Sequence, residues 1–197
     1  MDPASAEAIR NYVHGGGTVV MTALSAKVDE TSQWFDTPLP GRLADVFGIR
    51  TSEFYRPQTL PQITLNGKTE TASLRFYEVV EPLTAQPMAE FANTPERSPA
   101  ITVNRYGKGQ AIYVAVPAQM EVLAPLVRAL YPALGIEKGP ETPPGVYARV
   151  IEGRTLYVNT TGEDKDVPIR GRRRGVLSGT AYEGLVRLRA YAADLVE

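Results

Sequence analysis

The chain has 197 residues, no cysteine, and 21 lysines and arginines against 22 aspartates and glutamates. A chain of this length buries about 70% of its extended surface on folding, so it can build a hydrophobic core without covalent cross-links. The lack of cysteine excludes disulfides, thiolate metal sites and cysteine nucleophiles. The balanced charge offers no electrostatic attraction to nucleic acid or to an anionic membrane, and we expect neither partner.

No stretch of the sequence approaches the ~18 to 20 uninterrupted apolar residues of a membrane helix. A chain without cysteine also fits a reducing compartment. We therefore expect a cytoplasmic protein.

Residues 3–14 are predicted to form a helix that leads into a strand. Asp2 is a suitable N-cap, Pro3 suits the first helical position, and apolar side chains recur at helical spacing. Gly15–Gly17 should end the helix, and the β-branched run Thr18–Thr22 predicts a strand buried on both faces, as in a parallel sheet. A helix followed by such a strand is the second half of a βαβ unit, so we expect the chain to begin inside a domain.

A long loop, a short helix and a β-rich insertion are predicted next. The loop covers residues 23–38, and the helix lies near 40–47, where Gly48 supplies the left-handed cap. Asn66-Gly67 is a strong hairpin signal within an insertion at about 56–98. The strands expected there lie near 62–65, 68–71 and 74–80.

The α/β domain is expected to close at about residue 138. Two strands near 100–104 and 110–116 flank the glycine-containing turn Tyr106–Gly109. A helix over 119–131 follows, and Pro125 in its middle predicts a kink or a restart.

A second, smaller domain is expected after a linker. Residues 139–144 are rich in glycine and proline, which is typical of an inter-domain connection. Residues 145–197 consist of short runs separated by turn residues, which predicts a small antiparallel β-sandwich that packs against a neighbour. Its strands are expected near 146–151, 155–159, 166–169, 175–177 and 185–189.

Asp29 and Glu30 are the candidate carboxylates for acid/base chemistry. A glycosidase needs two carboxylates roughly 5 to 10 Å apart, one of them with a raised pKa. Adjacent residues on an extended loop point apart, which favours a structural role, with an interface or substrate-edge role as the alternative. His14, the only histidine, ends the first helix, where the helix dipole favours it, so we expect neither catalysis nor zinc binding there.

The glycine clusters and the basic run do not match ligand motifs. Gly15–Gly17 precede a strand, whereas phosphate-binding glycines follow a strand and open a helix. Tyr106–Gly109 lacks the spacing of a P-loop. The run Arg170–Arg174 has no interleaved aromatic residue and is interpreted as a solvated loop. We expect no cofactor and no metal ion.

Trp34 and Phe35 stand together on the long loop. Aromatic side chains on a loop can stack on a sugar ring, bury at a subunit contact, or join the core. The sequence leaves these three alternatives open.

Three ordered segments resemble the trimerisation domain of β-galactosidases of glycoside hydrolase family 42. They are residues 9–22 (IRNYVHGGGTVVMT), 25–30 (SAKVDE) and 38–49 (PLPGRLADVFGI). Residues 99–116 and 122–136 are similar to a later strand–turn–strand unit and to the closing helix of the same domain. The resemblance implies a flavodoxin-like or class I glutamine amidotransferase-like α/β domain, truncated at its N-terminus.

The end of the chain continues this resemblance. Residues 145–159 and 175–197 are similar to the small C-terminal β-domain of the same enzymes. The family's catalytic glutamates belong to a (β/α)₈ barrel that this chain does not resemble, so the resemblance supplies no catalytic residue. It implies a non-catalytic oligomerisation portion, trimeric in its parent enzyme, which hydrolyses terminal β-D-galactosides.

The sequence departs from the family pattern in one loop. Ala26 replaces a usual glycine, and residues 34–37 replace a glycine-rich approach. We expect subunit contacts in the loop over residues 28–40, with Trp34 and Phe35 as anchors.

Two rival hypotheses remain at this point. One is a stand-alone amidotransferase-like module that binds a small molecule or carbohydrate, without catalysis, at the C-terminal edge of its sheet. The other is an independent hydrolase that uses Asp29, Glu30 or His14.

Overall fold

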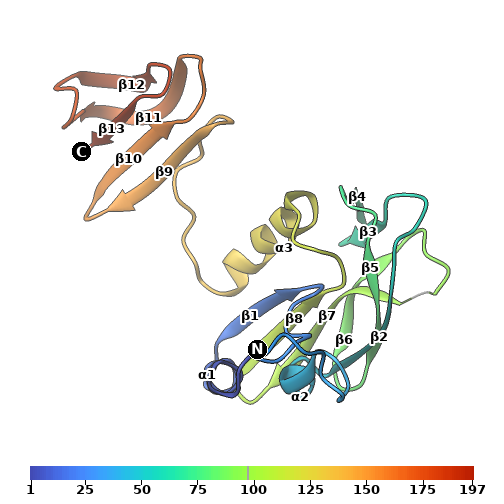
Figure 1. Cartoon of the computed structure of the whole chain (residues 1–197). Helices are drawn as coiled ribbons and strands as arrows, with labels where there is room; N and C mark the ends of the chain where they lie inside the picture. Colours follow the sequence, from blue (N-terminus) through green and yellow to red (C-terminus); the bar gives the residue numbers. More distant parts are fainter. Residues whose placement is uncertain (97) are drawn as a thin grey trace. The chain divides into compact units, whose positions relative to one another are not determined.

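The computed structural model describes residues 1–96 and 98–197. The chain forms two compact units, Met1–Leu130 and Tyr131–Glu197, each with its own hydrophobic core (Figure 1). The chain contains both helices and strands and is of the mixed α/β class. None of the described helices has the length and apolar character needed to cross a bilayer.

Among its described residues, the first unit contains three α-helices, a 3₁₀ helix and eight strands. Its helical elements are α1 (Pro3–His14), η1 (Gly41–Leu43), α2 (Ala44–Phe47) and α3 (Met120–Ala133), whose end continues into the second unit. Its strands are β1 (Thr18–Thr22), β2 (Ile49–Tyr55), β3 (Gln62–Leu65), β4 (Lys68–Thr71), β5 (Tyr77–Pro82), β6 (Gln86–Phe91), β7 (Pro99–Tyr106) and β8 (Gly109–Val114).

Helix α1 begins and ends as the sequence predicts. The Asp2 side chain accepts a hydrogen bond from the backbone N–H of Ser5 at 2.9 Å, which caps the first turn. At the other end, the N–H of Gly17 donates to the Tyr12 carbonyl at 2.9 Å. A Cβ at Gly17 would lie 2.3 Å from the Tyr12 ring, so a larger residue there would require this exposed ring to move.

Strand β1 pairs in parallel with β8, in the register Val20↔Ile112. The predicted strand and its parallel pairing are confirmed, but its predicted burial on both faces is wrong. Val20 is 36% exposed, because β1 is the edge strand of the sheet.

The main sheet has six strands in the order β1-β8-β7-β6-β3-β4. Every pairing within it other than β1–β8 is antiparallel. The hairpin predicted at Asn66-Gly67 is confirmed, with Leu65 opposite Lys68 and φ values of 52° and 76° at the two turn residues. The β-rich stretch thus extends the main sheet, while β2 and β5 pair separately.

Several predicted elements differ from the structure. Strand β2 was not predicted, because five of its seven residues are exposed and it lacks regular alternation. Strand β6 was missed because it contains Pro87, and a proline within a run argues against a strand. The strand expected near 74–80 begins only at Tyr77, and the final helix runs as one element through Pro125 without the restart.

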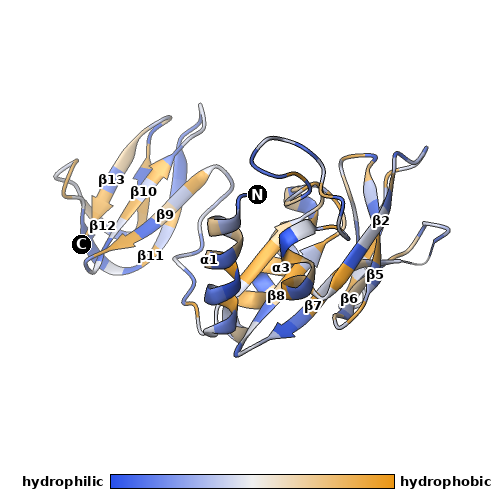
Figure 2. Ribbon diagram, turned by 60° about the horizontal axis from the view of Figure 1, so that its bottom comes forward, coloured by the Kyte–Doolittle hydropathy of each residue, from blue (hydrophilic) through white to orange (hydrophobic). Residues whose placement is uncertain are grey.

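The helices cover both faces of the sheet. The Asn104 side chain of β7 donates to the Val46 carbonyl of α2 at 2.8 Å. Ile101, three residues earlier on β7, lines a small cavity with Val122 and Pro125 of α3. Since positions three apart on a strand point to opposite faces, α2 and α3 lie on opposite sides. Figure 2 shows hydrophobic residues concentrated in β8, between these layers.

The second unit contains two small antiparallel sheets with a core between them. One has the order β13-β10-β9 and the other pairs β11 with β12. The strands are β9 (Val146–Ile151), β10 (Arg154–Asn159), β11 (Lys165–Arg174), β12 (Ala181–Leu188) and β13 (Ala193–Val196). Its buried side chains include Val146, Tyr157, Val167, Val186 and Leu188.

Three expectations for this unit are corrected. Arg170–Arg174 is exposed as expected, but it lies in β11 rather than in a loop, after a register shift in the pairing with β12. The strand expected at 175–177 is absent: Gly175 makes an isolated β-bridge with Val196, and residues 176–178 form a turn. Strand β13 was not predicted, since only four residues make it.

Asp194 holds that turn in place. Its carboxylate is 1% exposed and accepts hydrogen bonds from Ser178 Oγ at 2.6 Å, Tyr182 OH at 2.7 Å and the Leu177 N–H at 3.0 Å. Burial alone would raise the pKa of Asp194, but these bonds outweigh it and hold the pKa below 3.8. The ionised carboxylate therefore stabilises the fold.

We predict that Asp194→Ala destabilises the second unit by about 2–3 kcal/mol, because its three donors lose their acceptor. In the native chain the stabilisation by Asp194 is fully present above pH 3.8 and is lost as the pH falls through the lower folded pKa. The Asp194→Asn variant should lose less stability than the native chain when the pH is lowered. Hydrogen exchange of β10 and β13 between pH 2.5 and 6 measures both effects, and Asp166→Asn, at an exposed ion pair, is the control. Equal acid sensitivity of Asp194→Asn and the native chain would contradict this role.

Candidate functional site

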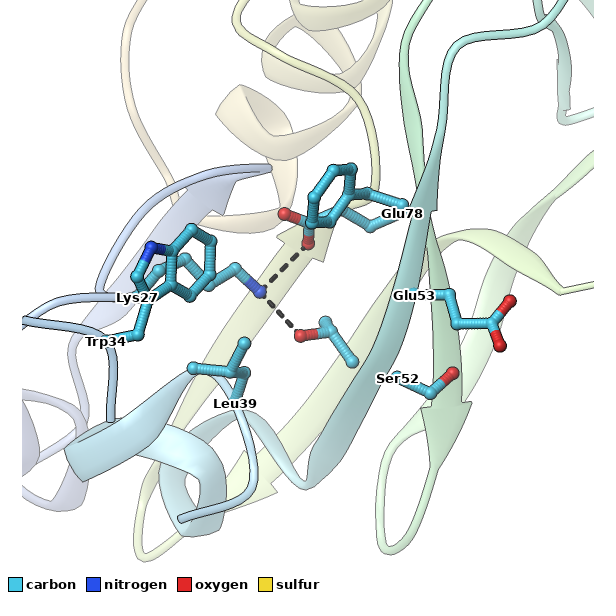
Figure 3. A pocket seen from close by; sticks show the side chains of 8 residues that line it. Lys27, Trp34, Leu39, Ser52, Glu53 and Glu78 are labelled. Atoms are coloured by element: carbon cyan, nitrogen blue, oxygen red, sulfur yellow. Dashed lines mark hydrogen bonds and ion pairs between the residues drawn. The ribbon is translucent and has the colours of Figure 1, made fainter. Parts of the chain in front are cut away.

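A cavity of the first unit lies near the carboxyl ends of the parallel strands β1 and β8. Its volume is about 350 Å³, within the usual range of small-molecule sites. The loop that follows β1 and the strands β2 and β5 supply its walls (Figure 3). The lining residues are Lys27, Trp34, Leu39, Thr51, Ser52, Glu53, Phe54 and Glu78.

A buried ion pair forms the base of this cavity. Lys27 Nζ lies 3.0 Å from Glu78 Oε2 and donates to Thr51 Oγ1 at 2.6 Å, and the two charged side chains are only 4% and 2% exposed. Glu78 also accepts from Tyr113 OH at 2.5 Å and from the Leu24 N–H at 2.9 Å. Figure 3 shows the Lys27 ammonium with its two interactions, to the Glu78 carboxylate and to the Thr51 hydroxyl, as dashed lines.

Burial shifts the pKa values of Lys27 and Tyr113 in this cluster. Burial lowers the pKa of Lys27 below its ordinary value, and the attraction of Glu78 offsets this only in part. Burial also raises the pKa of the Tyr113 hydroxyl, and the negative charge of Glu78 adds to the effect. In many buried ion pairs, the free energy lost when both charges leave water exceeds the free energy gained from their attraction. This pair is therefore expected to add little to the stability of the fold.

Aromatic rings form the open side of the cavity. Trp34 is 53% exposed, and its ring stacks on Phe54 at a centroid distance of 6.5 Å and an angle of 19°. Phe54 stacks in turn on Phe76 at 5.9 Å and 19°. A β-bridge between Val28 and Trp34 holds the tryptophan in place. We call Trp34, Phe54 and Phe76 the aromatic column.

The two carboxylates that the sequence singled out do not form an acid/base pair. Asp29 Oδ1 accepts from the Thr31 N–H and hydroxyl at 2.8 Å each and from the Gln33 N–H at 3.0 Å. The bonds from Gln33 and Thr31 lower the pKa of Asp29, which is the opposite of what a general acid needs. Glu30 lies 3.9 Å from the Arg42 guanidinium at the surface. Asp29 caps a turn.

Phe35 lies apart from the cavity. It is half-buried, with the Arg42 guanidinium 5.3 Å from its ring centroid. A Cβ at Gly41, where φ is 60°, would lie 2.2 Å from the ring. Phe35 therefore packs within the loop, and Trp34 alone of the aromatic pair lines the cavity.

The other sequence candidates have structural surroundings. His14 ends α1, its ring meets Tyr106 edge-on at 6.2 Å, and its carbonyl accepts from the Lys108 N–H at 3.0 Å. Tyr106–Gly109 forms the hairpin turn between β7 and β8, as predicted. In the part of the chain that the structure describes, no three His, Asp or Glu side chains gather as metal ligands would.

Sequence reasoning missed Lys27, Thr51 and Glu78. These residues are up to 51 positions apart, and only the tertiary fold brings them together. One signal was present: Glu78 interrupts the apolar run of strand β5, and a glutamate is almost never fully buried unless it is paired.

Residues 1–137 match the family model described as "Beta-galactosidase trimerisation domain". The chain is 31% identical, over 213 residues, to the β-galactosidase BglY of Alicyclobacillus acidocaldarius, an alignment that covers 99% of this chain and 31% of BglY. It also resembles, over its whole length, the crystal structure of a β-galactosidase from Bacillus circulans, with a TM-score of 0.85 and 26% identity. A β-galactosidase from Rahnella sp. R3 gives 0.84 and 26%. The chain spans 31% and 30% of these two structures.

We predict that the charges at the base of the cavity are strongly coupled. Lys27→Met alone strands a buried carboxylate and Glu78→Gln alone strands a buried ammonium, so each should destabilise the first unit by about 3–5 kcal/mol. The double variant, which removes both charges and keeps an oxygen acceptor for Tyr113, should lose less than either. Urea unfolding followed by Trp34 fluorescence measures this cycle, since Trp34 is the only tryptophan. Additive losses would show that the two side chains do not interact.

Proposed function

The chain belongs to the β-galactosidase trimerisation domain family, and on that premise we propose that it is the self-association portion of a longer β-galactosidase. The longer protein would hydrolyse terminal β-D-galactosides, with its catalytic glutamates in a (β/α)₈ barrel outside this sequence, and would assemble as a homotrimer. The observation that supports this most directly is the family match over residues 1–137. The share of the relatives that the chain spans, 31% of BglY, is consistent with an accessory portion.

The chemistry of the described acidic residues supports a non-catalytic role. Asp29 is held in its ionised form by turn hydrogen bonds. Glu78, the carboxylate inside the cavity, has Lys27 at 3.0 Å and Tyr113 at 2.5 Å as partners. Neither is a free acid beside a second carboxylate, which glycoside hydrolysis requires.

The loop over residues 28–40 is the proposed contact surface. The Trp34 ring is 53% exposed and Phe54 is also largely exposed, so the aromatic column presents apolar area that a second copy can cover. Phe35 supports the loop from within, and Asp29 and Glu30 would lie at the rim. In a cyclic trimer each copy would present this surface to a different patch of the next copy.

The finer fold assignment is also a proposal. The helix α1 and the parallel pair β1–β8 support a flavodoxin-like or amidotransferase-like first domain over residues 1–138, in which a further strand would pair with the open edge of β1. The absence of helix or strand between Ala133 and Val146 supports a linker at 139–144. The two sheets around one core support a β-sandwich over 145–197.

We predict that Trp34→Ala combined with Phe54→Ala weakens self-association at least tenfold, because the two rings supply the exposed apolar area of the surface. Sedimentation velocity over a hundredfold range of concentration measures the effect. Tyr147→Ala, at a tyrosine of the second unit that is 68% exposed, is the control. A native chain that stays monomeric throughout, or a double variant that associates as the native chain does, would refute the proposed surface.

We also predict that the chain does not hydrolyse a chromogenic β-galactoside. Glu53 and Glu78 both line the cavity, but the Glu53 carboxylate is directed away (Figure 3) and Glu78 is paired with Lys27, so the rate should equal that of buffer. The assay is run beside a full-length β-galactosidase of the same family as the positive control. Turnover that disappears in Glu78→Gln or Asp29→Asn would overturn the non-catalytic assignment.

A further inference from the structure

We propose that the cavity between the aromatic column and the Lys27–Glu78 pair is a binding site for a neutral, hydroxyl-bearing ring compound, the chemistry of a monosaccharide. The site would give the chain a ligand-binding function in addition to self-association. The proposal does not depend on the oligomeric state, because a single chain supplies every lining residue.

The position of the cavity favours a ligand. In open α/β sheets, ligands bind outside the carboxyl ends of parallel strands. Lys27 lies in the loop that follows β1, and Tyr113 lies one residue before the end of the parallel strand β8. The cavity, at about 350 Å³, is at the size of a small-molecule site and far too small for a folded partner.

The base of the cavity carries hydrogen-bond donors that its own contacts do not use. An ammonium has three N–H groups, and Lys27 directs two of them to Glu78 and Thr51 among the described residues. The Thr51 hydroxyl accepts from Lys27, so its own O–H can donate. Two donors at the bottom of an otherwise apolar cavity suit the oxygen atoms of a ligand.

The paired opposite charges at the base of the cavity favour a neutral ligand. Lys27 and Glu78 cancel each other at 3.0 Å. An anion would have to enter beside the Glu78 carboxylate, and a cation beside the Lys27 ammonium. Figure 3 shows the Glu53 carboxylate directed away from the pair, so it does not alter this balance.

The walls suit a ring with apolar faces. Trp34, Leu39 and Phe54 provide hydrophobic contact area around the buried polar base. A monosaccharide combines C–H faces with peripheral hydroxyl groups, so it matches both the walls and the base. Mostly apolar walls with a few placed polar groups are typical of ligand sites.

The energetics of the ion pair point in the same direction. Burial lowers the pKa of Lys27 despite the nearby carboxylate, so the charged pair is held at a cost to stability. In many proteins, apolar side chains of similar size replace a buried ion pair without loss of stability. Local departures from the most stable arrangement occur preferentially at functional sites.

The test uses the fluorescence of Trp34, which is the only tryptophan and forms a wall of the cavity. The full chain is titrated with D-galactose, with D-galacturonate as the charged analogue of the same ring, and with glycerol as a polyol without a ring. We expect a saturable change with D-galactose, binding at least tenfold weaker for D-galacturonate, and no saturation with glycerol.

Two variants assign the signal to the base of the cavity. Thr51→Val and the double variant Lys27→Met with Glu78→Gln should each weaken D-galactose binding about tenfold or more, because the first removes the Thr51 hydroxyl and the second removes the Lys27 ammonium. The matched control is the same double change, Arg50→Met with Glu81→Gln, at the exposed pair Arg50–Glu81, whose glutamate also lies in β5. Circular dichroism shows whether each variant is folded.

Every outcome decides the proposal. No saturable change with D-galactose, equal binding of D-galacturonate, or equal binding by the native chain and the folded base variants would each overturn it. Sedimentation tests self-association separately, so the two proposals fail independently.

Discussion

The parallel pairing of β1 with β8 is the constraint on which the rest of the first unit depends. It aligns Val20 with Ile112 and carries the loop after β1 to the end of β8, where Lys27 meets Glu78 and Tyr113. The helix that precedes β1 can lie close to β8 only because Gly109 has no side chain: a Cβ there would lie 2.2 Å from the Val13 carbonyl oxygen. A glycine at the start of one strand thus permits the contact that assembles the cavity.

The two units use a buried carboxylate in different ways. Asp194 is surrounded by neutral donors from Ser178, Tyr182 and the backbone, which stabilise its charge and fix a turn. Glu78 is balanced by an opposite charge, and its environment is open to a cavity. The first arrangement is complete in itself, because the turn and the Tyr182 side chain of β12 supply the donors around the carboxylate. The second leaves donors that an additional molecule can use, which is the physical difference between a structural and a binding carboxylate.

Short-range signals predicted the parts of the fold that short-range interactions determine. The Asp2 cap, the Asn66-Gly67 hairpin and the Gly48 helix end depend on a few neighbouring residues, and each is confirmed. Strands β2 and β13 carry weak local signals and form through pairing with strands distant in sequence, and β6 was missed because of Pro87. The same holds for the site. Trp34 could be singled out as a loop aromatic, whereas Lys27 and Glu78 acquire their role only from a contact 51 residues apart. The family resemblance, carried by ordered motifs, identified the relatives but not the cavity.

The edge position of β1 has a consequence for handling the chain in isolation. Its outer side presents backbone N–H and C=O groups with no partner among the described strands, and the run Thr18–Thr22 contains neither a charged residue nor a proline. Natural proteins use such residues as gatekeepers that prevent sheets from adding to one another indefinitely. Without them, two copies can join β1 to β1 and start an aggregate unrelated to ordered assembly. A lysine at Val20, whose side chain already faces solvent, would supply the missing gatekeeper without disturbing the core.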